Sequence, residues 1–349
     1  MPKKLGVAVI GAGMIGDVHV DRIRRDGRGE VRWLVARTED TVTEKLARHA
    51  VPCGTTDYRD VLDDDGVDAV VIASPPHTHL AILVDALAAG KHVLLEKPMV
   101  TTRAQLARLT ASVRRHPRQV VLECSCRHAR LQPKYRFVKD IVEGGELGRV
   151  YHIHHNHLMR STFIDYNPRG RWALRKELAG GGPFFDWGVY DLSFHLGILG
   201  DRPKLERARA FTRRGLKAFA QPAVRSNVEE HGAAYLELSG GLTYYYERGA
   251  GVHLEVANET RVYGTRGGLR FGFCSWDPPG VEVFTRDSAG HEHREVRVVD
   301  MAGHTDDNLE LTRHFFDCIL GRARPMMPVT LAAKHLDILF RIFEAAAGS

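Results

Sequence analysis

The sequence predicts an α/β protein in which a doubly wound parallel sheet is followed by a second α/β domain with a large, mostly antiparallel open sheet. Over the first third of the chain, short apolar runs alternate with helical segments, which is typical of a parallel sheet covered on both faces. Beyond about residue 126 the runs become longer and alternate in polarity. The 349 residues suffice for two domains, which we place at residues 1–125 and 126–349.

The N-terminal domain is expected to contain buried strands separated by helices. The first run, Leu5–Ile10, leads into a glycine-rich turn, and Val120–Cys124 is the expected last strand. Helices are expected over Thr41–His49 and His79–Ala89, the second of which ends at Gly90. The strands between the first and the last are expected at Val31–Ala36, Ala69–Ala73 and His92–Leu95.

The C-terminal domain is expected to begin with a helix over Pro133–Glu143 and to continue as a sheet. Ser239-Gly240-Gly241 is a hairpin signal that joins two of its strands. Helices over Asn308–Leu320 and Leu331–Ala346 close the chain. The expected strands are Arg149–Met159, Leu205–Arg213, His231–Leu238, Leu242–Glu247, Gly251–Ala257 and Val281–Thr285.

Composition excludes several classes of protein. With 44% hydrophobic and 26% charged residues, the chain is neither disordered nor collagen-like. Its net charge of +6 is mild and no recognition motif accompanies it, so nucleic acid is not an expected partner. No apolar stretch approaches the roughly 18 residues that a membrane span needs.

The cysteines and the N-terminus indicate a cytoplasmic protein. Five cysteines, an odd number without framework spacing, are typical of a reduced chain. Cys124 and Cys126 alternate along an apolar run, so both thiols are expected to be buried on one side of a strand. The first residues lead directly into a strand pattern and leave no room for a signal peptide.

A glycine motif, Gly11-x-Gly13-x-x-Gly16, follows the first strand and opens a helix. The first glycine permits a tight turn, the second permits close approach of a pyrophosphate, and the third permits close packing of helix on sheet. Because the helix N-terminus would face the phosphates, the motif predicts dinucleotide binding by a Rossmann domain. The alternative is a plain tight turn.

Arg37 decides the expected form of the dinucleotide. About 20 residues past the glycine turn, an acidic residue would normally bind the ribose 2′-hydroxyl. The second strand instead ends at Arg37-Thr38, and no carboxylate occurs before Glu39. An arginine there suits a 2′-phosphate, so we expect NADP to be preferred and NAD to remain possible. Alternatively, Arg37 stacks on the adenine or faces solvent.

Glu96-Lys97-Pro98 follows the strand at His92–Leu95. Ligands of open α/β sheets bind beyond the carboxyl ends of the strands, so Lys97 is expected to project into the cofactor crevice. Pro98 cannot continue a strand ladder and allows a cis peptide bond.

A triple glycine, Gly180–Gly182, precedes a helix expected to run to about Leu199. Asp186, Tyr190 and Ser193 share one face of that helix and could contact hydroxyl groups or pass a proton. Asp186 could instead be a simple N-terminal helix charge. His195, on the opposite side, is expected to be a packed histidine.

Four histidines on one expected strand suggest a metal site only at first sight. They alternate, two on each face, and no other Cys/His pair has ligand spacing, so no metal is expected. The four are His152, His154, His155 and His157.

Together these segments resemble the glucose–fructose oxidoreductase/inositol dehydrogenase family, written Gfo/Idh/MocA. The similarity extends from Leu5 to about Phe343. It rests on VAVIGAGMIGDVH, ASPPHTHLAILVDALAAGKHVLLEKPM, the helix that ends in GELGRV, and GGGPFFDWGVYDLSFHLGILG. The resemblance implies a Rossmann domain, a C-terminal α/β domain whose open sheet makes a homodimer or homotetramer, and redox chemistry on a sugar or cyclitol carbon.

The resemblance also assigns roles to residues. Lys97 matches the catalytic lysine and Asp186 the site aspartate, while Tyr190 stands where many members carry histidine. Trp172 matches a tryptophan common in the family, and Arg127 is assigned to the substrate. Three positions depart from the pattern, namely Pro76 for asparagine, Ala173 for arginine and Ser193 for an acidic residue.

The sequence therefore predicts an NAD(P)-dependent oxidoreductase that transfers hydride to or from a secondary alcohol or ketone carbon of a sugar, sugar derivative or cyclitol. Two alternatives stay open, namely glycoside cleavage by transient oxidation with NAD and a non-catalytic dinucleotide-binding regulator. Lys97, Tyr190 and Asp186 are the expected catalytic residues, and these three with Arg127 and Trp172 are expected to bind substrate. The expected cofactor-binding residues are Gly11, Gly13, Met14, Ile15, Gly16, Arg37, Thr38, Ser74, Pro75, His79, Glu96 and Lys97.

Overall fold

The computed structural model describes residues 4–216, 225–254 and 256–348, which form two compact units. Unit 1 consists of Met1–Arg127, Glu177–Gly180 and Asp306–Lys334. Unit 2 consists of His128–Lys176, Gly181–Thr305 and His335–Ser349. Each unit is described by itself.

Unit 1 contains a six-stranded sheet in the order β3-β2-β1-β4-β5-β6, and every neighbouring pair is parallel. The order runs outward from β1 in both directions, which confirms the predicted doubly wound sheet. The central strands read as continuous apolar runs because both of their faces are buried. The strands are β1 (Leu5–Ile10), β2 (Gly29–Val35), β3 (Cys53–Thr55), β4 (Ala69–Ile72), β5 (His92–Leu95) and β6 (Val121–Glu123).

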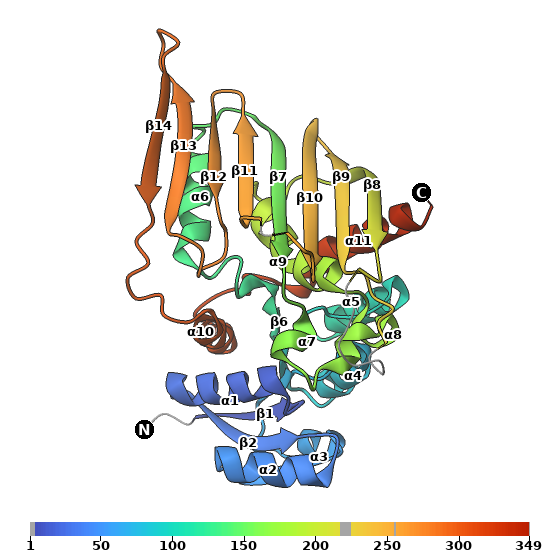
Figure 1. Ribbon diagram of the computed structural model, residues 1–349. Helices are drawn as coiled ribbons and strands as arrows, with labels where there is room; N and C mark the ends of the chain where they lie inside the picture. Colours follow the sequence, from blue (N-terminus) through green and yellow to red (C-terminus); the bar gives the residue numbers. More distant parts are fainter. Residues whose placement is uncertain (1–3, 217–224, 255, 349) are drawn as a thin grey trace. The chain divides into compact units, whose positions relative to one another are not determined.

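Helices α2, α5 and α10 of unit 1 (Figure 1) begin at residues whose side chains cap them. The Thr38 hydroxyl accepts the amide of Thr41, and Gly90 follows α4 with φ +74°, as predicted. Asp306 caps α10 and also binds Arg22 of α1 at 2.6 Å, which holds these two helices together. The helices are α1 (Met14–Asp26), α2 (Glu39–His49), α3 (Arg59–Leu62), α4 (His79–Ala88), α5 (Arg103–Arg115) and α10 (Asp307–Ile319).

The expected strand at Val120–Cys124 is shorter than predicted. It ends at Glu123 because the Glu123 carboxyl accepts the amide of Ser125 and turns the chain into a 3-10 helix over Cys124–Cys126. Cys124 and Cys126 are buried as expected, but they do not alternate on a strand. All five cysteines are free thiols.

Unit 2 contains an eight-stranded sheet in the order β14-β13-β12-β11-β7-β10-β9-β8. Only β7 and β10 pair in parallel, so the prediction of a mostly antiparallel sheet is confirmed. The β9–β10 hairpin turns at Gly240 and Gly241, which have φ +80° and +71°. The strands are β7 (Val150–Met159), β8 (Leu205–Arg213), β9 (His231–Leu238), β10 (Leu242–Ala250), β11 (Glu259–Gly264), β12 (Gly267–Phe271), β13 (Gly280–Arg286) and β14 (Glu292–Val298).

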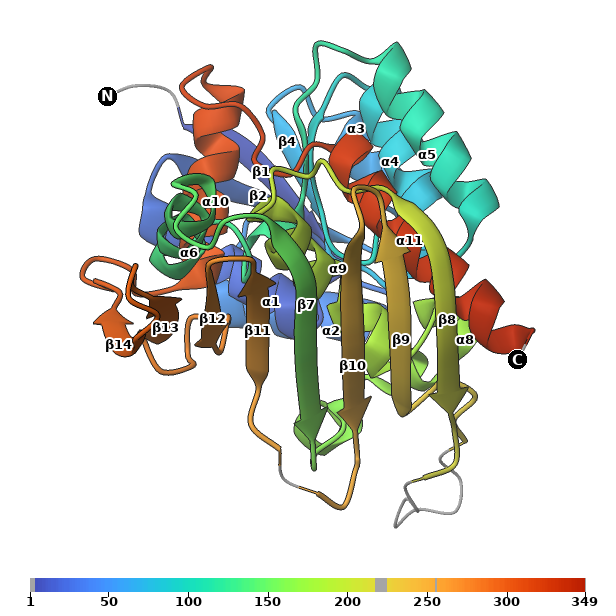
Figure 2. The same ribbon diagram turned by 90° about the horizontal axis from the view of Figure 1, so that it is seen from above.

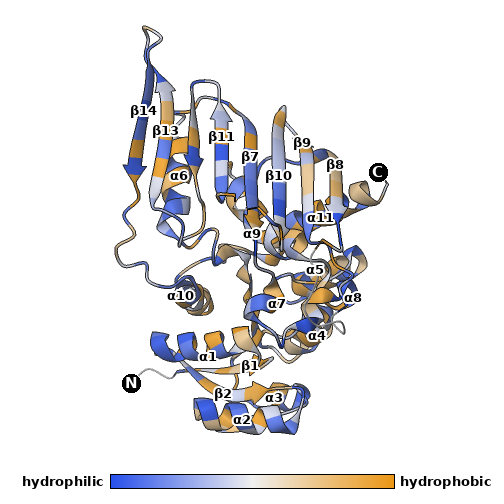
Figure 3. Cartoon of the chain, in the orientation of Figure 1, coloured by the Kyte–Doolittle hydropathy of each residue, from blue (hydrophilic) through white to orange (hydrophobic). Residues whose placement is uncertain are grey.

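One predicted strand is wrong. The described part of Gly251–Ala257 forms no strand, because β10 continues past Glu247 to Ala250 and the chain then turns into an exposed segment with Leu254 62% exposed. Four strands were not predicted, namely β3 of unit 1 and β11, β12 and β14 of unit 2. Charged side chains interrupt the apolar pattern of β14, and Figure 3 shows this edge strand as mostly hydrophilic. Charges on an edge strand discourage pairing with another sheet.

Helices α6 (Pro133–Glu143) and α9 (Pro183–Gly197) lie against one face of this sheet (Figure 2). Phe185 of α9 packs on Phe340 of α11 (Val329–Ala347) with ring centroids 5.5 Å apart. The remaining helices are short, namely α7 (Phe163–Tyr166) and α8 (Lys176–Ala179). Among the described residues, no helix combines the length and apolarity that crossing a membrane requires.

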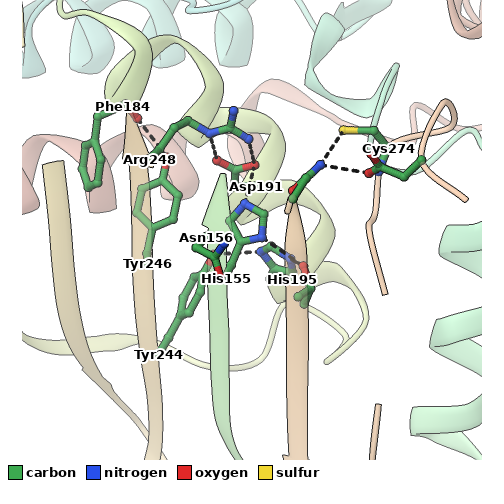
Figure 4. A network of polar contacts seen from close by, with 12 residues as sticks. His155, Asn156, Phe184, Asp191, His195, Tyr244, Tyr246, Arg248 and Cys274 are labelled. Atoms are coloured by element: carbon green, nitrogen blue, oxygen red, sulfur yellow. Dashed lines mark hydrogen bonds and ion pairs between the residues drawn. The ribbon is translucent and has the colours of Figure 1, made fainter. Parts of the chain in front are cut away.

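A buried polar network joins α9 to the sheet (Figure 4). Arg248 of β10 binds Asp191 of α9 through two hydrogen bonds of 2.7 Å, and both side chains are fully buried. His155 of β7 lies 3.4 Å from the same carboxylate. Although burial alone would raise the pKa of the Asp191 carboxyl, the charges of Arg248 and His155 hold that pKa far below its ordinary value. The pair is therefore ionised and fixes the rotation of α9.

Candidate functional site

The glycine turn after β1 can accept only glycine at two of its positions. Gly11 has φ +109°, and a Cβ there would lie 2.5 Å from the Ser74 amide nitrogen. A Cβ on Gly16 would lie 2.1 Å from the Gly11 carbonyl oxygen, so α1 packs directly on the turn. A Cβ on Gly13, in contrast, would meet no atom of the chain within 4 Å. Of the three glycines of this motif, Gly13 is therefore the one that borders open space.

The N-terminus of α1 has the features of an anion-binding site. Gly13 is the N-cap and supplies no side-chain hydrogen bond, so the first amides of the helix are not capped by a side chain. The one acidic side chain of the first turn, Asp17, is engaged by Lys45 at 2.6 Å and by His49 at 2.9 Å. Amides and helix dipole together suit a phosphate, and the open space at Gly13 fits the pyrophosphate of a dinucleotide.

Arg37 and Thr38 lie at the end of β2 beside this turn. The amides of Gly11 and Ala12 both donate to the carbonyl of Val35, the last residue of β2. Arg37 is exposed two residues later, and Thr38 caps α2. Met14 is 48% exposed and Ile15 is half-buried at the start of α1. The predicted cofactor residues of these two segments thus gather at one edge of the sheet.

A buried histidine, His79, supports the loop after β4. The ring of His79 is fully buried, and its Nε2 lies 2.7 Å from the Ser74 carbonyl oxygen. Burial lowers the pKa of His79, so the ring is neutral and donates this bond. The Ser74 hydroxyl bonds the Thr78 hydroxyl at 2.6 Å, and Pro75 is half-buried. His79 therefore supports the loop rather than presenting its ring to a ligand.

Glu96, at the end of β5, is the centre of a buried ion cluster. Its carboxylate accepts hydrogen bonds from Arg127 at 2.6 Å and from His19 of α1 at 2.9 Å. Burial alone would raise the pKa of the Glu96 carboxyl, but the charge of Arg127 and the contact with His19 hold that pKa well below its ordinary value. Arg127 is 4% exposed, so its guanidinium acts on Glu96.

Lys97 follows directly and is half-buried. Its amide donates to the second oxygen of Glu96 at 3.1 Å, and the Lys97–Pro98 peptide bond is cis, as the sequence allows. The ion cluster therefore sets the path of the chain through Lys97. This support was not evident in the sequence, where His19 reads as one more residue of an amphipathic helix.

One group within this cluster has the composition of a metal site. Ligand atoms of His19, Glu96 and Cys124 lie within 4.8 Å of one another, and all three residues are buried. However, Arg127 already neutralises the Glu96 carboxylate, and burial with the charge of Glu96 raises the pKa of the Cys124 thiol. A protonated thiol beside a guanidinium is a poor metal ligand, so we assign this group to structure.

In unit 2, the triple glycine before α9 accommodates a carboxylate from a distant part of the chain. Glu229 accepts the amides of Gly182 at 2.8 Å and Phe185 at 3.1 Å and so caps the helix. A Cβ on Gly182 would lie 1.9 Å from the Glu229 carbonyl oxygen. Burial raises the pKa of the Glu229 carboxyl to about 7, against the lowering effect of these hydrogen bonds. The glycines are needed for this contact, which sequence analysis did not identify.

Asp186 and Tyr190 occupy successive turns of α9, as predicted. Asp186 is half-buried. The burial of Tyr166 and the nearby charge of Asp186 both raise the pKa of the Tyr166 phenol. Tyr190 is 1% exposed and lies in a cluster of rings with His128 at 5.0 Å and Trp187 at 5.2 Å. This cluster fixes the position of the phenol.

The other residues expected near this face have different surroundings. Ser193 is fully buried and its hydroxyl accepts from Arg130 at 3.1 Å, so the expectation that it presents a hydroxyl to a ligand is wrong. His195 is a packed histidine, as predicted, and bonds Tyr244 and Thr260. Trp172 is half-buried and packs on Phe163, with ring centroids 6.2 Å apart.

The four histidines of β7 divide between the two faces of the sheet, as predicted. His155 and His157 face α9, where their rings lie 4.7 Å from His195 and 6.2 Å from Trp187. His152 and His154 lie on the other face, against Tyr263 and Tyr245. Burial lowers the pKa of His152 and His154, and it lowers the pKa of His157 to about 3.

Two family models match the chain. A model described as an oxidoreductase family with an NAD-binding Rossmann fold matches residues 5–124. The model of the GFO/IDH/MocA C-terminal domain matches residues 135–270.

Curated relatives are oxidoreductases. YrbE of Bacillus subtilis, an uncharacterized oxidoreductase, is 30% identical over 200 residues, which are 57% of this chain and 55% of that protein. Inositol 2-dehydrogenase of Streptomyces avermitilis is 33% identical over 192 residues, which are 51% and 55% of the two chains. D-xylose 1-dehydrogenase (NADP(+)) of Haloarcula marismortui is 24% identical over 83% of this chain and 75% of that protein. The matches span about half the length of the first two relatives.

Solved structures share the fold over nearly the whole chain. Levoglucosan dehydrogenase in complex with NADH and levoglucosan superposes with a TM-score of 0.84 and 18% identity, covering 99% of this chain and 98% of that chain. The aldose-aldose oxidoreductase of Caulobacter crescentus superposes with a TM-score of 0.79 and 22% identity, with the same coverage.

Two alanine substitutions in the glycine turn test the open space at Gly13. Gly13→Ala should leave the melting temperature nearly unchanged, because its methyl group meets no atom of the chain, but should weaken dinucleotide binding about ten-fold or more, which is about 1.4 kcal/mol. Gly16→Ala should lower the melting temperature sharply, because its methyl group would overlap the Gly11 carbonyl. Thermal denaturation and fluorescence titration with NADP and NAD measure the two effects. Unchanged affinity in Gly13→Ala would place the phosphates elsewhere.

Proposed function

The chain belongs to the Gfo/Idh/MocA family of oxidoreductases, and we propose that it transfers hydride between a nicotinamide dinucleotide and a secondary alcohol or ketone carbon of a sugar, sugar derivative or cyclitol. The observation that carries the proposal lies within unit 1. The uncapped amides at the N-terminus of α1, which border open space at Gly13, lie at the carboxyl edge of the parallel sheet. The buried ion cluster that supports Lys97 lies at the same edge. That edge is where α/β sheets bind their ligands.

The residues present fit a dinucleotide. The amides at the start of α1 would hold the pyrophosphate, and the loop at Ser74 and Pro75 would border the nicotinamide half. Nicotinamide, when bound, supplies or accepts the hydride. The names of relatives support the substrate class, since they include dehydrogenases of inositol and xylose.

Lys97 is the proposed acid and base. An alcohol carbon loses hydride readily only as its hydroxyl proton is removed, and a carbonyl carbon accepts hydride only as its oxygen is protonated. In our proposal, the Nζ atom of Lys97 takes that proton in one direction and returns it in the other. As an ammonium it also polarises the substrate oxygen. For Asp186 and Tyr190 of unit 2, we propose that they orient a substrate hydroxyl or relay a proton.

Lys97→Met tests this role because it keeps most of the bulk of the side chain. Turnover should fall by roughly 10² to 10⁴, the range expected for loss of a positioned acid/base. Circular dichroism and dinucleotide affinity should stay close to those of the parent. The assay follows nicotinamide absorbance with a panel of inositols, aldoses and levoglucosan. Lys139→Met, at a half-buried position of α6 in unit 2, is the control. A variant that retains more than about a tenth of parental turnover would exclude Lys97 as the acid/base.

We propose further that the chain prefers NADP, with the guanidinium of Arg37 bound to the 2′-phosphate. Arg37 is exposed beside the glycine turn, and one relative is named for NADP(+). Others are complexed with NADH, so the choice depends on this chain's own residues.

Arg37→Asp should reverse the order of affinities. The parent should bind NADP more tightly than NAD by about ten-fold, or about 1.4 kcal/mol. Arg37→Lys keeps the positive charge and should keep the order, while the aspartate would repel the phosphate. Fluorescence titration of the parent and both variants gives the dissociation constants for NADP and NAD. Equal affinities for the two dinucleotides in the parent would refute the proposal.

We also propose that the second face of the eight-stranded sheet joins copies of the chain. Phe211 and Tyr235 are 38% and 42% exposed there, and Tyr235 pairs across the sheet with Tyr245, which pairs in turn with His154. Exposed aromatic rings in a row are typical of protein interfaces. Light scattering should give a mass of two or four 39.0 kDa chains, and Tyr235→Glu should lower it. A single-chain mass for the parent would contradict the proposal.

A further inference from the structure

The cluster of rings around Tyr190 continues to an exposed tryptophan that has no role in the proposed function so far. The His128 ring lies 5.0 Å from that of Tyr190 and 5.1 Å from that of Trp276. The Trp187 ring also lies near both, at 5.2 Å and 6.1 Å. All four residues belong to unit 2. The cluster therefore leads from a phenol that we propose to contact substrate to the surface at Trp276.

The rings of this cluster differ in exposure. Tyr190 is 1% exposed, His128 and Trp187 are half-buried, and Trp276 is 56% exposed. The guanidinium of Arg248 lies over the Trp187 ring, 4.9 Å from its centroid, so a cation already occupies that indole. Trp276 is therefore the ring of the cluster that offers most of its surface to a ligand.

A buried ammonium fixes the loop that carries Trp276, residues 272–279 between β12 and β13. Lys134 of α6 is fully buried. Its Nζ lies within 3.3 Å of four carbonyl oxygens of the loop, those of Gly272, Cys274, Asp277 and Pro278. A buried ammonium is costly unless such hydrogen bonds compensate it, so the loop cannot move away without a large loss of free energy.

Side chains from other segments hold the same loop. The Asp277 carboxyl accepts the Cys274 amide at 2.8 Å and the side-chain amide of Asn258 at 2.9 Å. The side chain of Gln132 donates to the Phe273 carbonyl at 2.6 Å. An exposed indole contributes little to folding, because its apolar surface stays in water. A fixed backbone beneath it favours binding instead, because less conformational freedom is lost when a ligand is bound.

The exposed indole has the chemistry to bind one face of a sugar or cyclitol ring. The face of an aromatic ring carries partial negative charge. The C–H groups of a sugar ring carry partial positive charge because each carbon is bonded to oxygen. When the hydroxyls of a chair are equatorial, axial C–H groups cover both faces of the ring. We propose, resting on the proposed function, that Trp276 is a specificity-determining residue whose indole stacks on such a C–H face of a pyranose or cyclitol.

Substitutions at Trp276 separate stacking from apolar cover. Trp276→Ala should raise KM about ten-fold for whichever of D-xylose, scyllo-inositol and myo-inositol the parent oxidises best, and should leave kcat within about three-fold. Trp276→Phe keeps an aromatic face and should recover most of the affinity. Trp276→Leu keeps apolar bulk without that face and should resemble the alanine variant.

Levoglucosan and a second truncation are the matched controls. The internal bridge of levoglucosan holds its hydroxyls axial, so its KM should change less in Trp276→Ala than that of a ring with equatorial hydroxyls. Leu254→Ala shortens another exposed apolar side chain of unit 2 and should leave every KM unchanged. A KM in Trp276→Ala within about two-fold of the parent, or equal values in the leucine and phenylalanine variants, would overturn the proposal.

Acrylamide quenching of tryptophan fluorescence tests the stacking when no compound of the panel is oxidised. Trp276 is the most exposed of the four tryptophans, since Trp33, Trp172 and Trp187 are half-buried, so the parent should be quenched more than Trp276→Phe. With NADP or NAD present, scyllo-inositol or D-xylose should lower the quenching of the parent towards that of the variant. Glycerol at the same concentration of hydroxyl groups has no ring and should not.

The two measurements distinguish the possible failures. Protection from acrylamide without turnover would refute the proposed function and leave the stacking site standing. Turnover with an unchanged KM in Trp276→Ala would refute the stacking alone, and the absence of both turnover and protection would refute both. Protection that rises with protein concentration rather than with sugar would assign Trp276 to a contact between copies of the chain and would overturn the proposal.

Discussion

The buried negative charge of Glu96 is the constraint on which the functional edge of unit 1 depends. A carboxylate that stays ionised in a buried position must be paired, and here the pairing partners come from α1 and from the chain after β6. His19, Glu96 and Arg127 thereby tie a helix and two strand ends together, and the Lys97 amide binds the same carboxylate. Removing one member of such a buried set costs about 3–5 kcal/mol, because it leaves a charge unpaired. The path of the chain through Lys97 follows from this arrangement.

Backbone contacts that exclude a side chain set the starts of α1 and α9. At α1, Gly16 lies against the carbonyl of Gly11, and at α9, Gly182 lies against the carbonyl of Glu229. The consequences for the amides at these helix starts differ. The N-terminus of α1 keeps its amides available beside open space, whereas that of α9 is closed by the Glu229 carboxyl. The first suits a phosphate, and the second holds Asp186 and Tyr190 in a fixed orientation.

In unit 2, polar groups rather than apolar packing alone fix the register of α9 on the sheet. Asp191, Arg248 and His155 are fully buried, and His195 bonds both Tyr244 and Thr260. A helix with so many buried apolar residues could rotate among similar packings, but a bidentate ion pair is satisfied at one rotation only. Tyr190 adjoins Asp191 in sequence, so the ion pair that fixes one also fixes the other.

The sequence alone determined the doubly wound sheet, most of the second sheet, the glycine turn and the position of Lys97 at a strand end, because each depends on local periodicity or on short spacing. It also predicted the split of the β7 histidines, since alternation on a strand is local. Three predictions were wrong for different reasons. The hydroxyl of Ser193 is bound by Arg130, 63 residues away, which the sequence does not show. The strand placement of Cys124 and Cys126 was overridden by a local turn from Glu123 to Ser125, and the strand at Gly251–Ala257 by the continuation of β10 to Ala250. Glu96 with His19, Gly182 with Glu229, and Asp191 with Arg248 are separated by 77, 47 and 57 residues. Only the tertiary structure could pair them, because the cost of burying a charge or an amide depends on which partner the fold brings within reach.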